Sequence, residues 1–415
     1  MEDEGCDRHP KRSKPTNHCQ FPSTSMQEST STIPILPEEL ISEILSRLPV
    51  KPLLKFRCVS KSWLSLISST EFVNTHLSLS ANKKEYTHHM LILDSNYMLR
   101  HCNLRSLFRE ASIRSIDTDY PTKSNGSDKM WPDFDRIIGS VNGLICLSTE
   151  NDHLFMWNPS IRKYTKLPDP KPRLRKVYWR QYGFGYDEFH DDYKIVGIFF
   201  FDEYGTTNKD EIKIYSLKSD SWRSVDPCPI EDLSIDSGKF VKGKLHWLTK
   251  TPGYNFCKGG DIISLDLADE KWGKVEQPCY GEGDIELWAG VLGSDLSVFC
   301  ECDGIHVDGW VMKEYGVKES WTKIFTVKYP DMAYSDLKYP MFFMSNKGEV
   351  VIVFGSTSVI YNLKNGSLRL SKVIDVVGCH EVEIYVESLV CPFSTKGIED
   401  AAKTKGEKAQ IKTIE

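Results

Sequence analysis

Residues 35–80 read ILPEELISEILSRLPVKPLLKFRCVSKSWLSLISSTEFVNTHLSLS, and this stretch decides how the chain is organised. Leu40, Ile41, Ile44, Leu45 and Leu48 recur at helical spacing and would form one apolar stripe along a helix. The stretch therefore begins with a short amphipathic helix, and two further short apolar segments follow it.

Three residues mark the ends of these helical segments. Pro37 falls in the first turn, where a helix tolerates proline. Pro49 ends the first segment, because proline disrupts a helix interior. Ser60 is a candidate N-cap for a segment that contains Trp63. Residues 71–77 extend the helical pattern as a connector.

The stretch carries more apolar side chains than so small a unit can bury. It is about 45 residues long, below the size at which one hydrophobic core is self-sufficient. The surplus favours either a partner helix or groove, or a helical cap packed on the rest of the same chain. Composition alone leaves both interpretations open.

The order of residues resembles the F-box closely and nearly without gaps. In that family the segment is a small set of helices that docks on a Skp-type adaptor of the SCF ubiquitin ligase. The resemblance implies that the chain reaches cullin and RING subunits through this adaptor. The positions that it implies for adaptor contact are Leu36, Pro37, Leu40, Ile44, Leu45, Leu48, Pro49, Leu53, Leu54, Phe56, Arg57, Val59, Ser60, Lys61 and Trp63.

Length and charge narrow the classes of protein. The chain has 415 residues, which leaves room for two or three domains, or for one large β domain and a small module. The formal net charge of -6 gives no whole-protein argument for a nucleic-acid partner. No run approaches the roughly 18 apolar residues of a membrane span, so we expect no membrane partner.

The cysteines are scattered along the chain, and only Cys300 and Cys302 are close together. Cys-x-Cys is a poor spacing for zinc or a disulfide, so we expect no metal site and no cofactor. The N-terminus is charged rather than apolar, and we expect no signal peptide. Free thiols then indicate a reducing compartment, the cytoplasm and/or the nucleus.

Four regions follow from composition. Residues 1–34 are polar and broken by prolines, and residues 394–415 are polar and rich in lysine, so we predict that both are disordered. Residues 35–80 form the F-box helices, and residues 86–393 form a β domain.

A repeat runs through the β domain. Glycine turns before apolar strands place Gly143, Gly243, Gly293 and Gly348 at steps of 100, 50 and 55 residues, and a turn at 190–193 falls near the middle of the long step. Trp222, Trp272 and Trp321 follow strands at steps of 50 and 49 residues, with Tyr164 before them and Leu368 after them in the same layout. This period is typical of kelch-type propeller blades.

The repeat leaves some alternatives. A β-sandwich with accidental periodicity is the competing fold. We predict a propeller of six blades. Five or seven blades remain alternatives, because the doubled glycines of kelch repeats are mostly missing from this sequence. The strand at 383–390 is expected to pair with strands around 89–100 and close the ring, since both ends would otherwise expose sheet edges.

Four segments of the β domain resemble the plant F-box-associated domain. They are residues 140–147, 157–162, 182–187 with 191–196, and 310–317 with 320–321. The resemblance covers about residues 86–393. It implies a small all-α F-box module followed by an all-β, kelch-type propeller-like domain, but it does not identify the target.

We find no catalytic set in the sequence. His190, Asp191 and Asp192 could suggest a metal or acid-base cluster, but they occupy a hairpin position where aspartate favours a turn. No nucleophile elbow, phosphate loop or His-Glu-x-x-His motif is present. We therefore predict a non-catalytic chain. The F-box resemblance implies an adaptor, since the F-box subunit of an SCF complex acts by holding a substrate near the conjugating enzyme.

Two further surfaces give alternative functions. Arg173, Arg175 and Lys176 lie in a basic, proline-containing segment, which is either a solvated loop or a contact for an acidic target protein. Tyr178, Trp179 and Trp288 could stack on a sugar if they line the propeller mouth, which would make the chain a lectin-like F-box protein recognising a glycan or small molecule. A hydrolase or oxidase propeller is a third class, and the lack of a spaced His, Cys or carboxylate set speaks against it.

Overall fold

The computed structural model describes most of the chain. The described residues are 36–81, 87–118, 134–149, 152–172, 177–201, 211–227, 233, 236–249, 260–281, 283, 285–328, 341–345, 347–354, 357–376 and 378–393. Two compact units divide at residues 41 and 42, and of the first unit only residues 36–41 are described. The segments predicted to be disordered, 1–34 and 394–415, lie outside the described residues.

The first described elements are four helices, and the first of them begins directly after Pro37 and ends at Ser46, before Pro49. They are α1 (Glu38–Ser46), α2 (Val50–Phe56), α3 (Lys61–Ser68) and α4 (Thr70–Ala81). Ser60 is the N-cap of α3, because its hydroxyl accepts a hydrogen bond from the amide of Trp63 at 3.1 Å. Pro49 lies directly before α2 in an extended conformation, so it separates the first two helices.

In the described part of the chain, six antiparallel sheets follow the helices. The first sheet has β25 (Glu381–Val386), β1 (His88–Leu93), β2 (Leu99–Asn103) and β4 (Ile116–Asp117), and the second has β5 (Arg136–Val141), β6 (Leu144–Ser148), β7 (Leu154–Asn158) and β8 (Lys163–Lys166). The third has β9 (Val177–Asp187), β10 (Asp192–Phe201), β11 (Glu211–Ser216) and β12 (Ser221–Val225), and the fourth has β13 (Lys239–Val241), β14 (Lys244–Leu248), β15 (Ile262–Asp266) and β16 (Trp272–Val275). The fifth has β17 (Ile285–Leu292), β18 (Asp295–Cys302), β19 (His306–Met312) and β20 (Trp321–Lys328), and the sixth has β21 (Met341–Met344), β22 (Glu349–Phe354), β23 (Thr357–Asn362) and β24 (Leu368–Val373). The short β3 (Ser112–Ile113) adds a parallel edge to β24, and α6 (Leu104–Leu107) and η1 (Lys318–Ser320) lie in connections.

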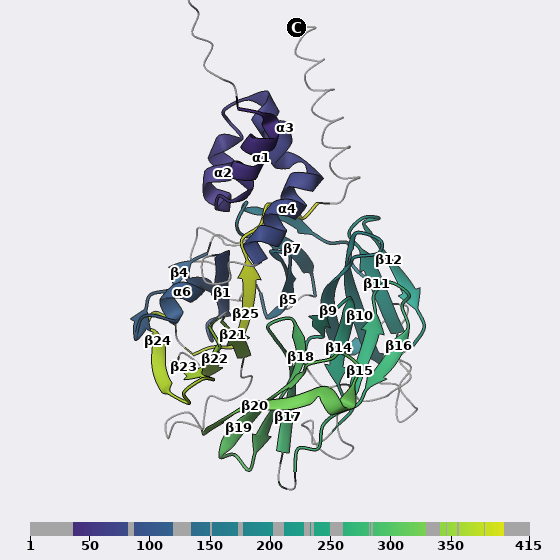
Figure 1. The fold of residues 1–415 in the computed structure, drawn as a ribbon. Helices are drawn as coiled ribbons and strands as arrows, with labels where there is room; N and C mark the ends of the chain where they lie inside the picture. The colour runs from purple at the N-terminus through teal and green to yellow at the C-terminus, as the bar shows by residue number, and fades with distance from the viewer. Residues whose placement is uncertain are drawn as a thin grey trace, which may run out of the picture. The chain divides into compact units, whose positions relative to one another are not determined.

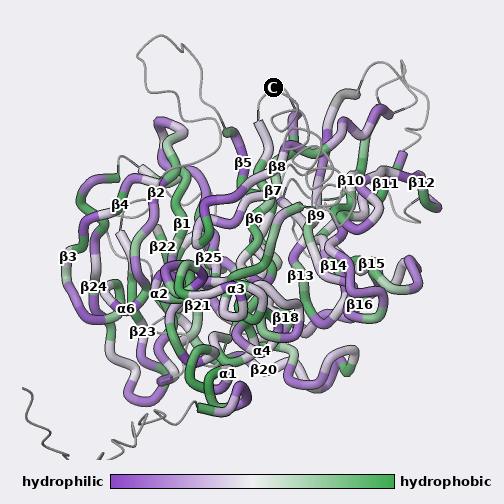
Figure 2. The backbone as a smooth tube through the Cα atoms, turned by 90° about the horizontal axis from the view of Figure 1, so that it is seen from above, coloured by the Kyte–Doolittle hydropathy of each residue, from purple (hydrophilic) through white to green (hydrophobic). Residues whose placement is uncertain are grey.

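The sheets follow one another around a common centre, as Figures 1 and 2 show. Each sheet is one blade, so the prediction of a six-bladed propeller is confirmed. Six clusters of buried apolar side chains fill the six interfaces between neighbouring blades. A four-stranded sheet has two apolar faces to cover, and radial stacking covers both of them.

The repeated glycines occupy the same place in four blades. Gly143, Gly243, Gly293 and Gly348 lie in the turns that join the innermost strand of a blade to its second strand. All four have positive φ, which glycine adopts without steric cost. In the blade between the first two of these, Asp191 takes the turn position with φ of 51°. The period in the sequence is therefore the period of one hairpin per blade.

The repeated tryptophans tie each blade to the connection that enters it. The indole N–H of Trp222 donates to the carbonyl of Pro168 at 2.6 Å. Trp272 donates in the same way to Asp226 at 3.3 Å, and Trp321 to Glu276 at 2.8 Å. Tryptophan serves this position because its ring covers apolar surface while its single donor binds a carbonyl.

The C-terminal strand closes the ring. β25 pairs with β1 in antiparallel register from His88 with Val386 to Leu93 with Glu381, which confirms the predicted closure. The strand occupies 381–386 rather than 383–390, because the chain leaves the sheet after Val386 to meet Asn158. The Asn158 side-chain amide donates to the carbonyls of Ser388 at 3.1 Å and Val390 at 2.8 Å.

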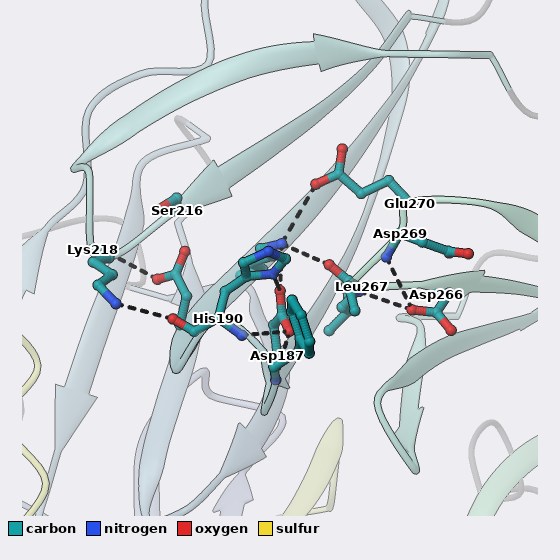
Figure 3. Close-up of polar contacts among 12 residues, drawn as sticks. Asp187, His190, Ser216, Lys218, Asp266, Leu267, Asp269 and Glu270 are labelled. Atoms are coloured by element: carbon teal, nitrogen blue, oxygen red, sulfur yellow. Dashed lines mark hydrogen bonds and ion pairs between the residues drawn. The ribbon is translucent and has the colours of Figure 1, made fainter.

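A buried lysine joins two neighbouring blades. The ammonium of Lys194 donates to the Asp187 carboxylate at 2.7 Å and to the carbonyl of Leu267 at 2.6 Å, with Glu270 at 3.5 Å. Figure 3 shows Asp187, Leu267 and Glu270 converging from two blades. Burial alone would raise the pKa of Asp187, but hydrogen bonds from Lys194 and His190 lower it overall. The charge is thus paired, as a buried charge must be.

Candidate docking surface and central cavity

The helices expose large apolar side chains. Leu36 is 53% exposed, Leu40 45%, Ile44 54%, Val59 61% and Leu64 47%. Leu40 and Ile44 are one helical turn apart on α1, so they share a face of that helix. Exposed apolar groups of this density on a small module indicate a surface for a partner.

The positions implied for adaptor contact divide by exposure. Leu45 and Leu53 are buried, at 2% and 0% exposure, and they lie among the other buried residues of the helices, Val50, Ile67 and Phe72. The exposed positions are Leu36, Pro37, Leu40, Ile44, Pro49, Val59, Ser60 and Lys61, and the half-buried ones are Leu48, Leu54, Phe56, Arg57 and Trp63. We therefore assign Leu45 and Leu53 to the packing of the helices.

Leu64 is an exposed apolar residue that the sequence reasoning did not include. It lies on α3, where Trp63, Leu64, Leu66 and Ile67 give four large apolar side chains in eight residues. At about 100° per residue they span an arc of roughly 160°, wider than the stripe of about 100° that a helix needs to pack on one neighbour. The width of this apolar arc was the available signal.

The fourth helix, α4, behaves as a helical cap on the same chain, one of the two interpretations that composition left open. Val73 and Leu77 of α4 pack against the buried cluster between the blade β5–β8 and the blade β9–β12. The His76 ring also lies 2.8 Å from the carbonyl of Leu48, which links α4 to the end of α1. α4 therefore packs on its own chain, whereas Ile44, Val59 and Leu64 keep their exposure.

A cavity of about 510 Å³ lies where the blades meet, a size in the range of small-molecule sites. The innermost strand of every blade contributes to its lining. One lining residue from each of these strands is Arg136, Trp179, Lys239, Trp288, Phe343 and Glu381, in chain order from β5 to β25. The propeller therefore has a central site that no pair of blades could form alone.

Charged and aromatic groups meet in this cavity. The Arg136 guanidinium lies 3.7 Å from the Glu381 carboxylate and 5.5 Å from the ring centre of Trp179. Glu381 also accepts a hydrogen bond from the amide of Ile137 at 2.5 Å. Burial raises the pKa of Glu381 to about 7, against the opposing effect of Arg136. Burial raises the pKa of the nearby Glu383 as well.

The other predicted surface residues have mixed outcomes. Arg173, Arg175 and Lys176 lie outside the described residues, as does the side chain of Tyr178. Trp179 and Trp288 both line the central cavity. The sugar-stacking hypothesis required that these aromatic residues line the propeller mouth. Trp179 is 38% exposed but Trp288 only 7%, so Trp179 offers most of the accessible ring surface.

The His190 region forms a turn of the kind predicted from its aspartates. The His190 ring nitrogen lies 2.6 Å from the Asp187 carboxylate, and the hydroxyl of Tyr186 donates to Asp191 at 2.5 Å. Asp192 accepts a hydrogen bond from the amide of Lys218 at 2.9 Å. Each carboxylate thus has a structural hydrogen-bond partner, and these residues hold two neighbouring hairpins together.

Comparison with known proteins agrees with this architecture. Residues 33–75 match the family "F-box domain", and residues 89–391 match the family "F-box associated beta propeller domain". F-box/kelch-repeat protein At3g23880 of Arabidopsis thaliana is 32% identical over 367 residues, covering 86% of this chain and 96% of the relative. F-box protein CPR1 of the same plant is 30% identical over 385 residues, covering 86% and 88%.

An F-box followed by a propeller defines a class of substrate adaptors for SCF ubiquitin ligases. The chain belongs to the F-box proteins that carry an F-box-associated beta propeller domain. An F-box implies binding of a Skp-type adaptor, and adaptors of this family are generally non-catalytic. In the described part of the chain, no helix has both the length and the apolar character needed to cross a bilayer.

Proposed function

We propose that this chain is the substrate-recognition subunit of an SCF-type ubiquitin ligase. Its helices bind a Skp-type adaptor, which brings cullin and RING subunits, and its propeller binds a target protein for ubiquitination and proteasomal degradation. The observation that carries the proposal is the exposed apolar set on helices that match an F-box.

The exposed residues supply the driving force for adaptor binding. Ile44 on α1, Val59 after α2 and Leu64 on α3 each leave about half or more of their surface in water. Full burial of such a side chain is worth about 1.5–3 kcal/mol. The buried Leu45 and Leu53 contribute indirectly, because they hold the helices that present these side chains.

The test replaces exposed apolar groups with charge. Ile44→Asp combined with Val59→Asp should abolish co-purification of a Skp-type adaptor and leave the thermal unfolding midpoint within a few degrees of wild type. The matched control is Leu368→Asp with Leu370→Asp, two residues of the outer strand β24 that are 53% and 55% exposed. Undiminished adaptor binding by the Ile44 and Val59 double variant would reject the docking assignment.

The propeller supplies the target site, and the chain itself performs no chemistry. Holding a target beside the conjugating enzyme raises its effective concentration, which is sufficient for an adaptor to act. We propose the basic segment with Arg173, Arg175 and Lys176 as a contact for an acidic target surface. Reversing these three residues to Glu should reduce target capture; unchanged capture by a folded variant would exclude the segment.

We place this function in the cytoplasm and/or the nucleus. The thiols of Cys58, Cys102, Cys146 and Cys279 are free, which supports a reducing compartment. Imaging of the full chain with a small tag, together with cell fractionation, would test the expectation; secretion would contradict it.

Binding of a small polar molecule in the central cavity is a second candidate function. The observation that favours it is the meeting of the Trp179 ring with Arg136 and Glu381 in one cavity. An aromatic face beside a charged pair suits a glycan, whose hydroxyls donate and accept hydrogen bonds. In a thermal-shift screen, a sugar that binds should raise the unfolding temperature of wild type but not that of Trp179→Ala. Tyr164→Ala, which alters an exposed ring outside the cavity lining, is the control.

A further inference from the structure

The hairpin of β18 and β19 gathers four potential metal ligands on one face. Cys300 pairs with Asp308, and Cys302 pairs with His306, across the antiparallel ladder. Directly paired residues project from the same face of a sheet, as do residues two apart along a strand. Two thiols, one imidazole and one carboxylate therefore lie together at the end of this blade (Figure 1 shows the strands).

Three of the four groups, Cys302, His306 and Asp308, lie close enough together to share a small cation, and the thiol of Cys300 lies beside that of Cys302. The two thiol sulfurs are 3.7 Å apart, and the Nε2 of His306 lies 3.8 Å from a carboxylate oxygen of Asp308. The ligand atoms of Cys302, His306 and Asp308 all lie within 4.8 Å of one another. In a tetrahedral zinc site with Zn–S bonds of about 2.3 Å, two sulfurs are about 3.8 Å apart.

The surroundings orient the ligands. Asp308 is 3% exposed, and its carboxylate accepts from the hydroxyl of Thr326 at 2.5 Å and from the ammonium of Lys323 at 3.1 Å. Such outer contacts fix the direction of a ligating carboxylate. Two thiolates and a carboxylate with Zn²⁺ carry one net negative charge, which the Lys323 ammonium balances.

The turn that joins the strands is preformed. Asp303 and Gly304 have φ of 52° and 64°, and the amide of Ile305 donates to the carbonyl of Cys302 at 3.0 Å. A hairpin turn of this kind fixes the register of the two strands, which keeps Cys302, His306 and Asp308 side by side. Cys300 is buried, whereas Cys302 and His306 are half-buried, which leaves a route for the ion to enter.

We propose that Cys300, Cys302, His306 and Asp308 bind one Zn²⁺ as a structural site that fastens the β18–β19 hairpin. Two sulfurs, one nitrogen and one oxygen form a ligand set that zinc accepts in tetrahedral geometry. Four protein ligands leave no open position, so the site is structural. Zinc binds cysteine as the thiolate, so metal binding releases the protons of both thiols. The proposal does not depend on adaptor binding.

The test measures metal in the full-length protein. Elemental mass spectrometry should find about one zinc ion per chain in protein that is purified without chelator and then desalted. Replacement by Co²⁺ should give the thiolate charge-transfer absorption and the intense visible bands of tetrahedral cobalt. Cys302→Ser and His306→Ala should each lower zinc content at least several-fold, and excess zinc should raise the unfolding temperature of wild type only.

The control is Cys279→Ser, which removes an exposed thiol outside the cluster and should keep the full zinc content. His306→Ala changes a side chain that is 30% exposed, so this variant should fold without the ion. Zinc well below one equivalent in wild type, or equal zinc in wild type and His306→Ala, would overturn the proposal. A disulfide between Cys300 and Cys302 in the native protein would do the same.

Discussion

The F-box helices and the propeller handle apolar surface in opposite ways. The ring covers its apolar faces blade against blade and closes with β25 on β1, and among the described residues a buried cluster lies between each pair of neighbouring blades. The helices bury Leu45 and Leu53 but leave Ile44, Val59 and Leu64 about half exposed or more. Closure makes a fold self-sufficient, whereas a short helical module completes its packing with another molecule.

The largest effect should come from opening the ring. A chain that ends at His380 lacks β25 and the carbonyls that bind Asn158. The edge of β1 that now pairs with β25 would be exposed, so we expect loss of cooperative unfolding and aggregation. A chain that ends at Phe393 keeps every described residue and should unfold like wild type. Circular dichroism and size-exclusion chromatography measure the difference; a soluble, cooperatively folded short chain would contradict this view of closure.

The next largest loss of stability should come from breaking the buried ion pair of Lys194 with Asp187. Lys194→Ala leaves the Asp187 carboxylate buried without its cation, and removal of one partner of such a pair costs about 3–5 kcal/mol of unfolding free energy. Lys218→Ala, which removes an exposed hydrogen bond to the carbonyl of His190, is the matched control and should change little. Chemical denaturation measures both.

The same link predicts a dependence on acid. The pKa of Asp187 is lower in the folded chain than in the unfolded chain, so its stabilisation is present above the ordinary range near ~3.9 and is lost as pH falls through the lowered value. Wild type should therefore lose this stabilisation on acidification, and Lys194→Ala should lose less. Parallel slopes for the two proteins in acid would contradict the assignment.

Two adjacent residues of α1, Leu45 and Ile44, should separate the packing of the helices from the docking of a partner. Leu45→Ala should cost about 2–5 kcal/mol of unfolding free energy, because it opens a cavity among buried side chains. Ile44→Ala should stay within about 0.5 kcal/mol, because that side chain faces water, yet it should weaken adaptor binding. Denaturation and adaptor titration on the same samples separate the roles. Equal loss of stability in both variants would remove the distinction between packing and docking.

The smallest effect should come from the repeated tryptophans. Trp321→Phe removes the donor to the carbonyl of Glu276 and should cost about 0.5–1.5 kcal/mol, the usual net contribution of one hydrogen bond. Trp310→Phe is the control, because the Trp310 indole N–H has no hydrogen-bond partner among the described residues. Its replacement should be close to neutral. Thermal unfolding compares them, and an equal loss in both would show that ring packing, not the hydrogen bond, matters at Trp321.

Sequence patterns predicted the elements that repeat along the chain. The glycine and tryptophan periods corresponded to one hairpin and one outer strand per blade, and Ser60 capped a helix. These features are local, so neighbouring residues are enough to define them. The face that each apolar residue presents was not predictable, and Leu45 is therefore buried although the family resemblance implied contact.

The candidate sites depended more strongly on packing. The cavity needs one strand from each blade, and no local pattern reports which side chains point inward. The spacing of Cys300 and Cys302 argued against zinc when taken alone. His306 and Asp308 join them only through the register of a hairpin, although the Asp-Gly turn at 303–304 was a signal for it.

By itself, the sequence determined that a helical module precedes a ring of sheets, and that the ring has a period near 50 residues. Periodicity along a chain is enough for this, because each blade repeats the same hairpins and the same connections. Only the tertiary structure decided which helix residues stay exposed, what lines the central cavity and which thiol, imidazole and carboxylate groups meet on β18 and β19. Those outcomes depend on contacts between residues far apart in the sequence, and close packing admits few arrangements of them.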